Sequence, residues 1–117
     1  MKARPLSVTI IGWLFMIFGS VALLSGLLPL AGADIARILA ELKTHWMVHL
    51  ARLAGIVSGL FMLHGFNWAR WLLVVWMIFH VVVSALHSWL QLVIHVSIFS
   101  VILFFLFRPR ASEFFAR

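Results

Sequence analysis

The sequence contains no cysteine and only three carboxylate side chains, Asp34, Glu41 and Glu113. Without cysteine the chain forms no disulfide, offers no thiolate to a metal ion and performs no cysteine chemistry. None of the three acids falls inside a long apolar stretch. Charged residues make up 10% of the 117 residues, whereas a soluble domain carries roughly 25%. These scarcities exclude an ordinary soluble domain.

Apolar residues dominate what remains. They make up 65% of the chain, and the mean hydropathy is +1.16. The longest uncharged run, 71–107, has 37 residues. As one helix it would measure ~55 Å, nearly twice the ~30 Å of a bilayer core. The run therefore has to fold back on itself as a helical hairpin within a membrane.

Two further uncharged runs, 5–33 and 53–69, complete a pattern of four crossings. Each crossing is close to the ~20 residues that a helix needs to span the hydrocarbon core. The sequence thus predicts an all-α fold, a four-transmembrane-helix bundle that forms a single integral membrane domain over 1–117. Its spans are expected at about 6–28, 46–65, 68–86 and 89–107.

Residues with special backbone preferences mark the ends of these spans. Pro29 and Gly32 are expected to stop the first span. Gly65 suits the left-handed cap that ends the second span, and Asn67 suits the N-cap of the third. Ser88 is the expected N-cap of the fourth.

The segment 29–45 is the one substantial stretch expected outside the bilayer. Asp34 can N-cap a short helix there. The apolar residues of this segment recur at helical spacing: Ile35, Ile38, Leu39 and Leu42. This pattern predicts a short amphipathic helix on the outer membrane surface. The alternative is that these residues extend the second span.

Lysine and arginine set the expected orientation. One side of the membrane carries six of them: Lys2, Arg4, Arg70, Arg108, Arg110 and Arg117. The other side carries three: Arg37, Lys43 and Arg52. The positive-inside rule then predicts that both termini are cytoplasmic. Because topology accounts for the net charge of +6, no nucleic acid is expected as a partner.

The first 33 residues also have features of a cleaved leader. Lys2 and Arg4 precede an apolar stretch that ends in Ala31-Gly32-Ala33, a small-residue pattern typical of cleavage sites. The apolar stretch exceeds the usual length of roughly 7–15 residues. It is therefore interpreted as a membrane span, with cleavage as the alternative.

Small residues form two stripes on the first two spans. On the first they recur every seven residues: Gly12, Gly19 and Gly26. On the second they recur every four: Ala51, Gly55 and Gly59. Helices in lipid associate through close van der Waals contact, which small residues permit. The stripes predict packing of the first span against the second, with a dimer interface as the alternative.

Histidines are the remaining candidates for chemistry. His45 and His49 lie four apart on one face of the second span, and Arg52 follows three residues later. By helix rise, His80 and His95 both fall roughly 10–12 Å below the outer end, and Arg52 at about 9 Å. Convergence in the outer half of the bundle is therefore expected for one set: His49, Arg52, His80, His87 and His95.

Three interpretations of this group remain open. The simplest is that the imidazoles form interhelical hydrogen bonds. The second is ligation of haem b or a divalent metal, and the third is a quinone or proton pathway. His80, His95 and Arg52 are the candidate cofactor-binding residues. The candidate metal ligands are His45, His49 and His87.

Catalytic motifs are missing. His45 and His49 have the spacing of a zinc peptidase motif, but Trp46 stands where that motif needs glutamate. There is no nucleophile elbow, phosphate-binding loop or carboxylate pair. Proton-coupled small multidrug exporters are similar in size and span count, but they depend on a glutamate in the first span, which this chain lacks. No catalytic residue is predicted.

Three short pieces of the chain form a further pattern: residues 4–10, residues 67–70, and 107–109 with the tail Phe114-Phe115. Together they resemble small, uncharacterised four-helix proteins of the bacterial inner membrane. The resemblance implies a multi-pass topology and no particular activity. The chain is therefore expected to act through helix contacts in the lipid bilayer, as an accessory subunit of a larger membrane complex or as a homo-oligomer. The alternative is a histidine-ligated haem, metal or quinone site.

Overall fold

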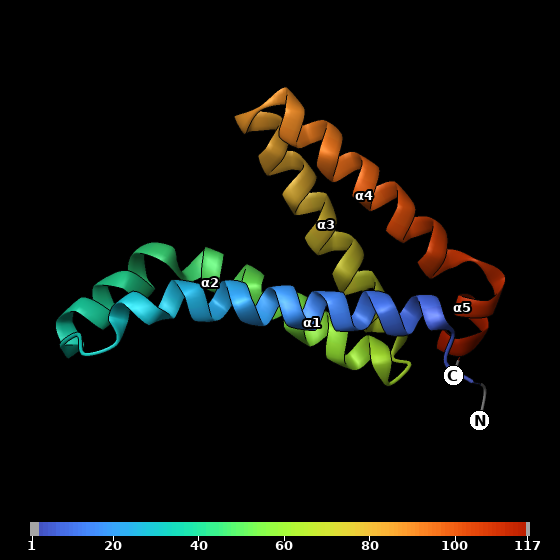
Figure 1. The fold of residues 1–117 in the computed structure, drawn as a ribbon, viewed down its shortest axis with the longest axis horizontal. Coiled ribbons are helices and arrows are strands. Elements are labelled where there is room, and N and C mark those ends of the chain that lie inside the picture. Colours follow the sequence, from blue (N-terminus) through green and yellow to red (C-terminus); the bar gives the residue numbers. More distant parts are fainter. Residues whose placement is uncertain (1–2, 117) are drawn as a thin grey trace.

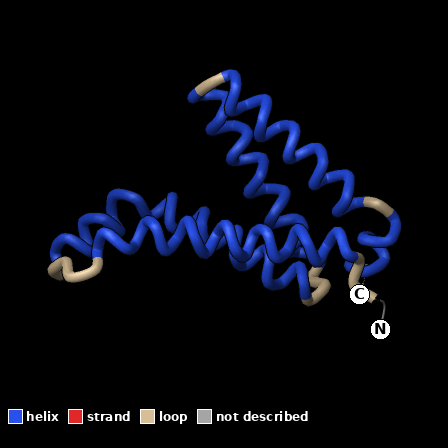
Figure 2. The backbone as a smooth tube through the Cα atoms, viewed as in Figure 1, coloured by secondary structure: helices blue, strands red, loops and turns tan. Residues whose placement is uncertain are grey.

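The computed structural model describes residues 3–116, so Lys2 and Arg117 of the charge count lie outside it. The chain folds into helices joined by short turns (Figure 2). Within the described residues, four helices are long and apolar enough to cross a membrane. The elements in order are α1 (Leu6–Leu27), the 3₁₀ turn η1 (Leu28–Leu30), α2 (Ile35–Leu63), α3 (Asn67–His87), α4 (Trp89–Phe107) and α5 (Pro109–Phe115).

The four long helices form two antiparallel hairpins, α1–α2 and α3–α4 (Figure 1). Each helix packs on the next one in the chain. The hairpins meet where α1 and α3 begin and α2 and α4 end, next to α5; we call this the shared end. From there they diverge, so that the tips carrying the α1–α2 and α3–α4 turns lie far apart (Figure 1). The expected bundle is thus closed at one end only.

Most of the predicted helix ends are confirmed. The Asp34 carboxylate accepts a hydrogen bond from the Arg37 backbone N–H at 2.8 Å, and the Ser88 hydroxyl accepts one from the Gln91 N–H at 3.1 Å. Gly32 has a φ of 79°, a left-handed conformation that glycine adopts without strain. These side chains and turns satisfy backbone groups that a helix end leaves unpaired.

The turn between α2 and α3 is built differently from the prediction. Gly65 does take the left-handed conformation, with φ 85°, and its N–H donates to the Met62 carbonyl at 3.0 Å. The expected N-cap at Asn67 is wrong. Asn67 is already the first helical residue, and Phe66 holds the extended cap position without a side-chain hydrogen bond. After Gly65, only Phe66 separates the turn from α3, so Phe66 has to take that position.

The predicted amphipathic helix and the second span are parts of one helix. His45, with φ −115° and ψ 20°, interrupts the helical geometry of α2 and bends it. The Glu41 carboxylate lies 3.0 Å from His45 Nδ1 at this bend. Ile35 and Leu39 are 77% and 60% exposed, whereas Ile38 is half-buried, so the described chain leaves most of the apolar face of this first segment uncovered. The alternative, that these residues extend the second span, is therefore confirmed, whereas the position of the segment on the outer membrane surface stays a prediction.

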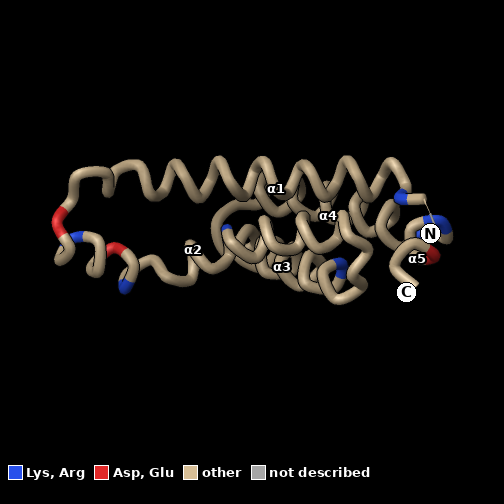
Figure 3. Tube along the Cα trace, turned by 90° about the horizontal axis from the view of Figure 1, so that it is seen from below, with Lys and Arg blue, Asp and Glu red and all other residues tan. Residues whose placement is uncertain are grey.

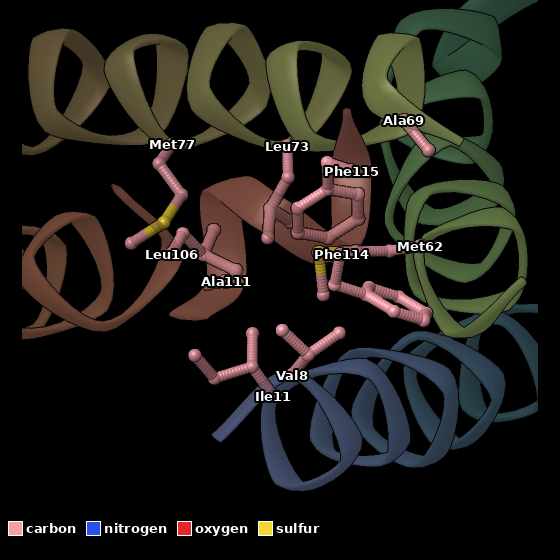
Figure 4. Packing of buried hydrophobic residues seen from close by; sticks show 10 residues of the cluster. All are labelled: Val8, Ile11, Met62, Ala69, Leu73, Met77, Leu106, Ala111, Phe114 and Phe115. Carbon is pink, nitrogen blue, oxygen red and sulfur yellow. The ribbon is translucent and has the colours of Figure 1, made fainter. Parts of the chain in front are cut away.

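The hydrophobic core lies at the shared end (Figure 4). It includes α5, a helix that was not predicted from the sequence. Pro109 occupies the first turn of α5, where its missing N–H costs nothing. Ala111, Phe114 and Phe115 then fall at helical spacing and pack against buried residues of the four long helices. The same spacing is visible in the sequence and could have revealed this helix.

Candidate functional site

His80 and His95 lie together within the second hairpin. The centroids of their rings are 6.5 Å apart, and the ring planes differ by 25°. Ser84, which is 5% exposed, lies between the two helices, with its Oγ 3.0 Å from His95 Nδ1. The uncharged hairpin therefore carries a small polar cluster, which we define as His80, Ser84 and His95.

Hydrogen bonds to backbone carbonyls fix the tautomers of this polar cluster. His80 Nδ1 lies 2.9 Å from the Trp76 carbonyl, and His95 Nδ1 lies 2.8 Å from the Gln91 carbonyl. A carbonyl only accepts, so Nδ1 carries the proton in both neutral rings. The Ser84 hydroxyl donates to the His80 carbonyl at 2.7 Å, and its oxygen can accept the His95 N–H. The Nε2 atom of each ring is left with its lone pair.

Trp76 places the polar cluster next to the junction of the two hairpins. Its indole N–H donates to the Ala51 carbonyl of α2 at 2.6 Å, and its ring meets Phe15 of α1 edge to face at 5.3 Å. The His80 ring lies over Trp76, with centroids 3.8 Å apart. Because residues four apart share a helix face, His80 lies on the side of α3 that faces the first hairpin.

Arg52 lies elsewhere, within the first hairpin. A Cβ added to Gly26 of α1 would overlap the Arg52 guanidinium, so the two are in direct contact. His49, one turn before Arg52, is 7% exposed, and neither ring nitrogen has a hydrogen-bond partner within residues 3–116. The structure thus divides the expected group. His80 and His95 come together in one hairpin, whereas Arg52 contacts α1 in the other.

The remaining histidines stay apart from the polar cluster. His45 pairs with Glu41 at the bend of α2. His87 and His64 are exposed and place Nδ1 at 2.8 Å and 2.9 Å from carbonyls of their own helices. Within residues 3–116, no three His, Cys, Asp or Glu side chains form a group that could hold a metal ion. The imidazoles of His80 and His95 come closest to forming a set of metal ligands.

The glycine stripe of α1 lies along α2. A Cβ on Gly12 would approach Leu63, one on Gly19 would approach Ile56, and the backbone oxygen of Gly12 lies 2.6 Å from a Cβ added to Gly59. The stripe of α2 is divided between two neighbours. Gly59 faces α1, whereas Gly55 lies 3.7 Å from Trp76 of α3 and the Ala51 carbonyl accepts the Trp76 bond. A four-residue repeat drifts around a helix with 3.6 residues per turn, so it reaches both neighbours.

The shared end also holds a buried arginine, Arg70, whose charge in the sequence indicates only membrane orientation. Arg70 is 9% exposed, and its guanidinium lies 4.4 Å from the Phe107 ring and 5.0 Å from the Phe115 ring. Its Nη1 lies 3.4 Å from the Leu106 carbonyl and from Ser112 Oγ. Arg70 therefore joins α3 to both α4 and α5. No motif marks this role, because it depends on where α5 packs.

Comparison with known proteins adds no identity. No family model matches the chain, and no curated protein or solved structure matches it. What stands is a small multi-pass membrane protein with four candidate spans.

Proposed function

We propose that this chain is a non-enzymatic subunit of the bacterial inner membrane that acts through helix–helix contacts of its second hairpin. It would do so in a homo-oligomer or a larger membrane complex, with both termini cytoplasmic. The observation that carries the proposal is the exposure of α4. Leu106, at the shared end, is the one residue of α4 that is buried. Over the rest of its length α4 packs mainly on α3, with a smaller contact to α1, and most of its surface is open to other helices.

Polar groups on the second hairpin favour its association with other helices over its exposure to lipid. Apolar surface gains little from leaving lipid for another helix, because lipid tails are equally apolar. Hydroxyl and imidazole groups do gain, through interhelical hydrogen bonds. On α4, Ser97 and Ser100 are exposed and bond only to carbonyls of their own helix, at 2.7 Å and 2.8 Å. By helical spacing these two hydroxyls lie on the face of α4 opposite His95, which contacts α3, and α4 is the least buried of the four long helices.

The absence of cysteine makes the proposal directly testable. Single cysteines at Ser97→Cys and Ser100→Cys would be oxidised or cross-linked in native membranes, without background from other thiols. Ser25→Cys is the matched control, because Ser25 is an exposed serine on α1 of the first hairpin. We expect cross-linked species from the α4 positions and none from Ser25→Cys. Monomer alone from all three variants contradicts the proposal.

The size of the cross-linked product identifies the partner. A product of twice the mass of 13.3 kDa indicates a homo-oligomer. A larger product that contains a second protein indicates an accessory subunit. Reporter fusions at each terminus test the orientation in the same strain, and a periplasmic signal from either terminus contradicts the cytoplasmic assignment.

Ligation by His80 and His95 is the second candidate function. The observation that favours it is that carbonyls hold Nδ1–H in both rings, which leaves both Nε2 atoms free to bind a metal. Zinc takes about four ligands, so the remaining ligands would come from other molecules. A visible spectrum, elemental analysis and quinone extraction of protein from native membranes test this. His80→Ala and His95→Ala should lose the bound species and His64→Ala should keep it; its absence from the unaltered protein contradicts the idea.

A further inference from the structure

A cavity of about 700 Å³ lies at the shared end, between the beginning of α1 and the corner where α4 passes into α5. One wall comes from residues around Arg4 and Leu6, and the other from residues 105–114. The cavity lies where the apolar spans end. In a bilayer this level corresponds to the junction of the acyl chains with the headgroups.

The cavity is basic. Arg4, Arg108 and Arg110 line it, against one acid, Glu113. Figure 3 shows charged residues at both ends of the molecule, this end among them. Hydrogen bonds to Thr9 Oγ1 at 2.9 Å and to the Leu63 carbonyl at 3.0 Å hold the Arg4 side chain in place.

The other two arginines keep free donors. The Arg108 guanidinium lies 5.5 Å from the Phe105 ring centroid. Within residues 3–116, neither Arg108 nor Arg110 forms an ion pair, and the same holds for Glu113. A guanidinium binds phosphate oxygens in a bidentate manner through its planar array of donors. The cavity therefore offers unused donors for a phosphate group.

The remaining lining is apolar. Leu6 and Ile10 of α1 are 73% and 50% exposed, and Phe105 faces them from α4. A soluble anion gains nothing from such a wall, whereas an amphiphile places its headgroup on the arginines and its chains along the helices. Basic pockets at the ends of membrane helices bind anionic headgroups by this arrangement.

We propose that this cavity is a binding site for the phosphate headgroup of an anionic phospholipid, whose acyl chains lie against α1 and α4. Arg108 and Arg110 bind the phosphate, Arg4 adds a fixed positive charge, and Glu113 limits the affinity. The site does not depend on how the second hairpin associates.

Native mass spectrometry of the full chain in a neutral detergent tests the site, with phosphatidylglycerol or phosphatidylcholine added as the probe. We expect the unaltered protein to retain phosphatidylglycerol in preference to phosphatidylcholine. The double variant Arg108→Gln/Arg110→Gln should bind phosphatidylglycerol about thirtyfold more weakly, because each basic residue near an anionic headgroup contributes on the order of a fivefold change. The control Arg37→Gln/Lys43→Gln removes the same charge at the other end of the protein and should bind as the unaltered protein does.

A second variant tests the site without removing an arginine. Glu113→Gln eliminates the one negative charge of the cavity and should tighten phosphatidylglycerol binding by about fivefold. Equal binding of the two lipids overturns the proposal, as does unchanged binding by both cavity variants. Inorganic phosphate is the competing ligand: if millimolar phosphate displaces the lipid completely and itself remains bound, the site is a phosphate site and the lipid assignment is wrong.

Discussion

The two hairpins of this protein differ in the contacts that hold their own two helices together. α1 and α2 approach closely because glycines remove side chains from their interface: the Gly12 carbonyl oxygen lies only 2.6 Å from where a Cβ on Gly59 would sit. α3 and α4 contain no glycine at all. Polar contacts join them instead: Ser84 Oγ lies 3.0 Å from His95 Nδ1, and at the shared end Arg70 Nη1 lies 3.4 Å from the Leu106 carbonyl.

This difference indicates that the α1–α2 hairpin is rigid and that the α3–α4 hairpin can adapt to other helices. Backbone contact between glycines depends on shape along the whole interface and fails when one Cβ is added. A single polar contact typically contributes about 0.6 kcal/mol in a membrane bundle, so another helix can replace it at little cost. The second hairpin also contains α4, the least buried of the four long helices, which agrees with a role in association.

Among the substitutions that test this comparison, Gly59→Ala should lower the free energy of unfolding most. Its Cβ would meet the Gly12 backbone oxygen, which cannot move aside as a flexible side chain does. We expect a loss of about 2 kcal/mol in the free energy of unfolding, typical of overpacking. Gly55→Ala is the control, because its Cβ would lie 3.7 Å from Trp76 in ordinary contact. Reversible unfolding in mild detergent measures both, and equal losses would show that the α1–α2 interface has no special tightness.

Trp76→Phe should weaken the junction between the hairpins by an intermediate amount. The substitution keeps an aromatic ring near Phe15 but removes the N–H that donates to the Ala51 carbonyl. A hydrogen bond of this kind contributes about 1 kcal/mol. Spin-label distances between the tip of α2 and the tip of α4 should broaden, because the angle between the hairpins is less constrained. Trp89→Phe, at a ring that is 78% exposed, should leave the distances unchanged.

Ser84→Ala should have the smallest effect on stability, about 0.6 kcal/mol. It removes the one hydroxyl that contacts both His80 and His95 of the polar cluster. Ser97→Ala removes a hydroxyl that bonds only to its own helix and should change stability less. The histidine ring resonances in NMR spectra should shift in Ser84→Ala and stay in place in Ser97→Ala. A larger loss in Ser97→Ala would mean that Ser97 has a partner outside this chain.

Much of the fold could be predicted because it depends on local chemistry. Uncharged runs locate the four helices, and Asp34, Gly65 and Ser88 mark ends through hydrogen bonds within a few residues. The N-cap of α3 was predicted wrongly by one residue, at Asn67 instead of Phe66, and this error also concerns local structure. The sequence does show the helical spacing of Ala111, Phe114 and Phe115, but α5 has only 7 residues and the packing that buries them at the shared end is not visible in it.

The candidate site could be predicted only within a hairpin. Counting depth from one turn brings His80 level with His95, because the two residues lie on helices joined by that turn. The same counting placed Arg52 at their level, yet level residues meet only if their helices are adjacent and face each other. Arg52 is on the face of α2 that contacts Gly26, and α2 diverges from α3 beyond the Trp76 contact (Figure 1).

By itself the sequence determines four helices that are long and apolar enough to cross a membrane, because a bilayer requires uncharged helices of about one length. The tertiary structure alone decides that the hairpins close at one end and diverge at the other. The physical reason is that apolar side chains do not discriminate between lipid and protein as neighbours. Which helices remain together then depends on a few close or polar contacts: the glycines of α1, the Trp76 hydrogen bond and the packing of α5.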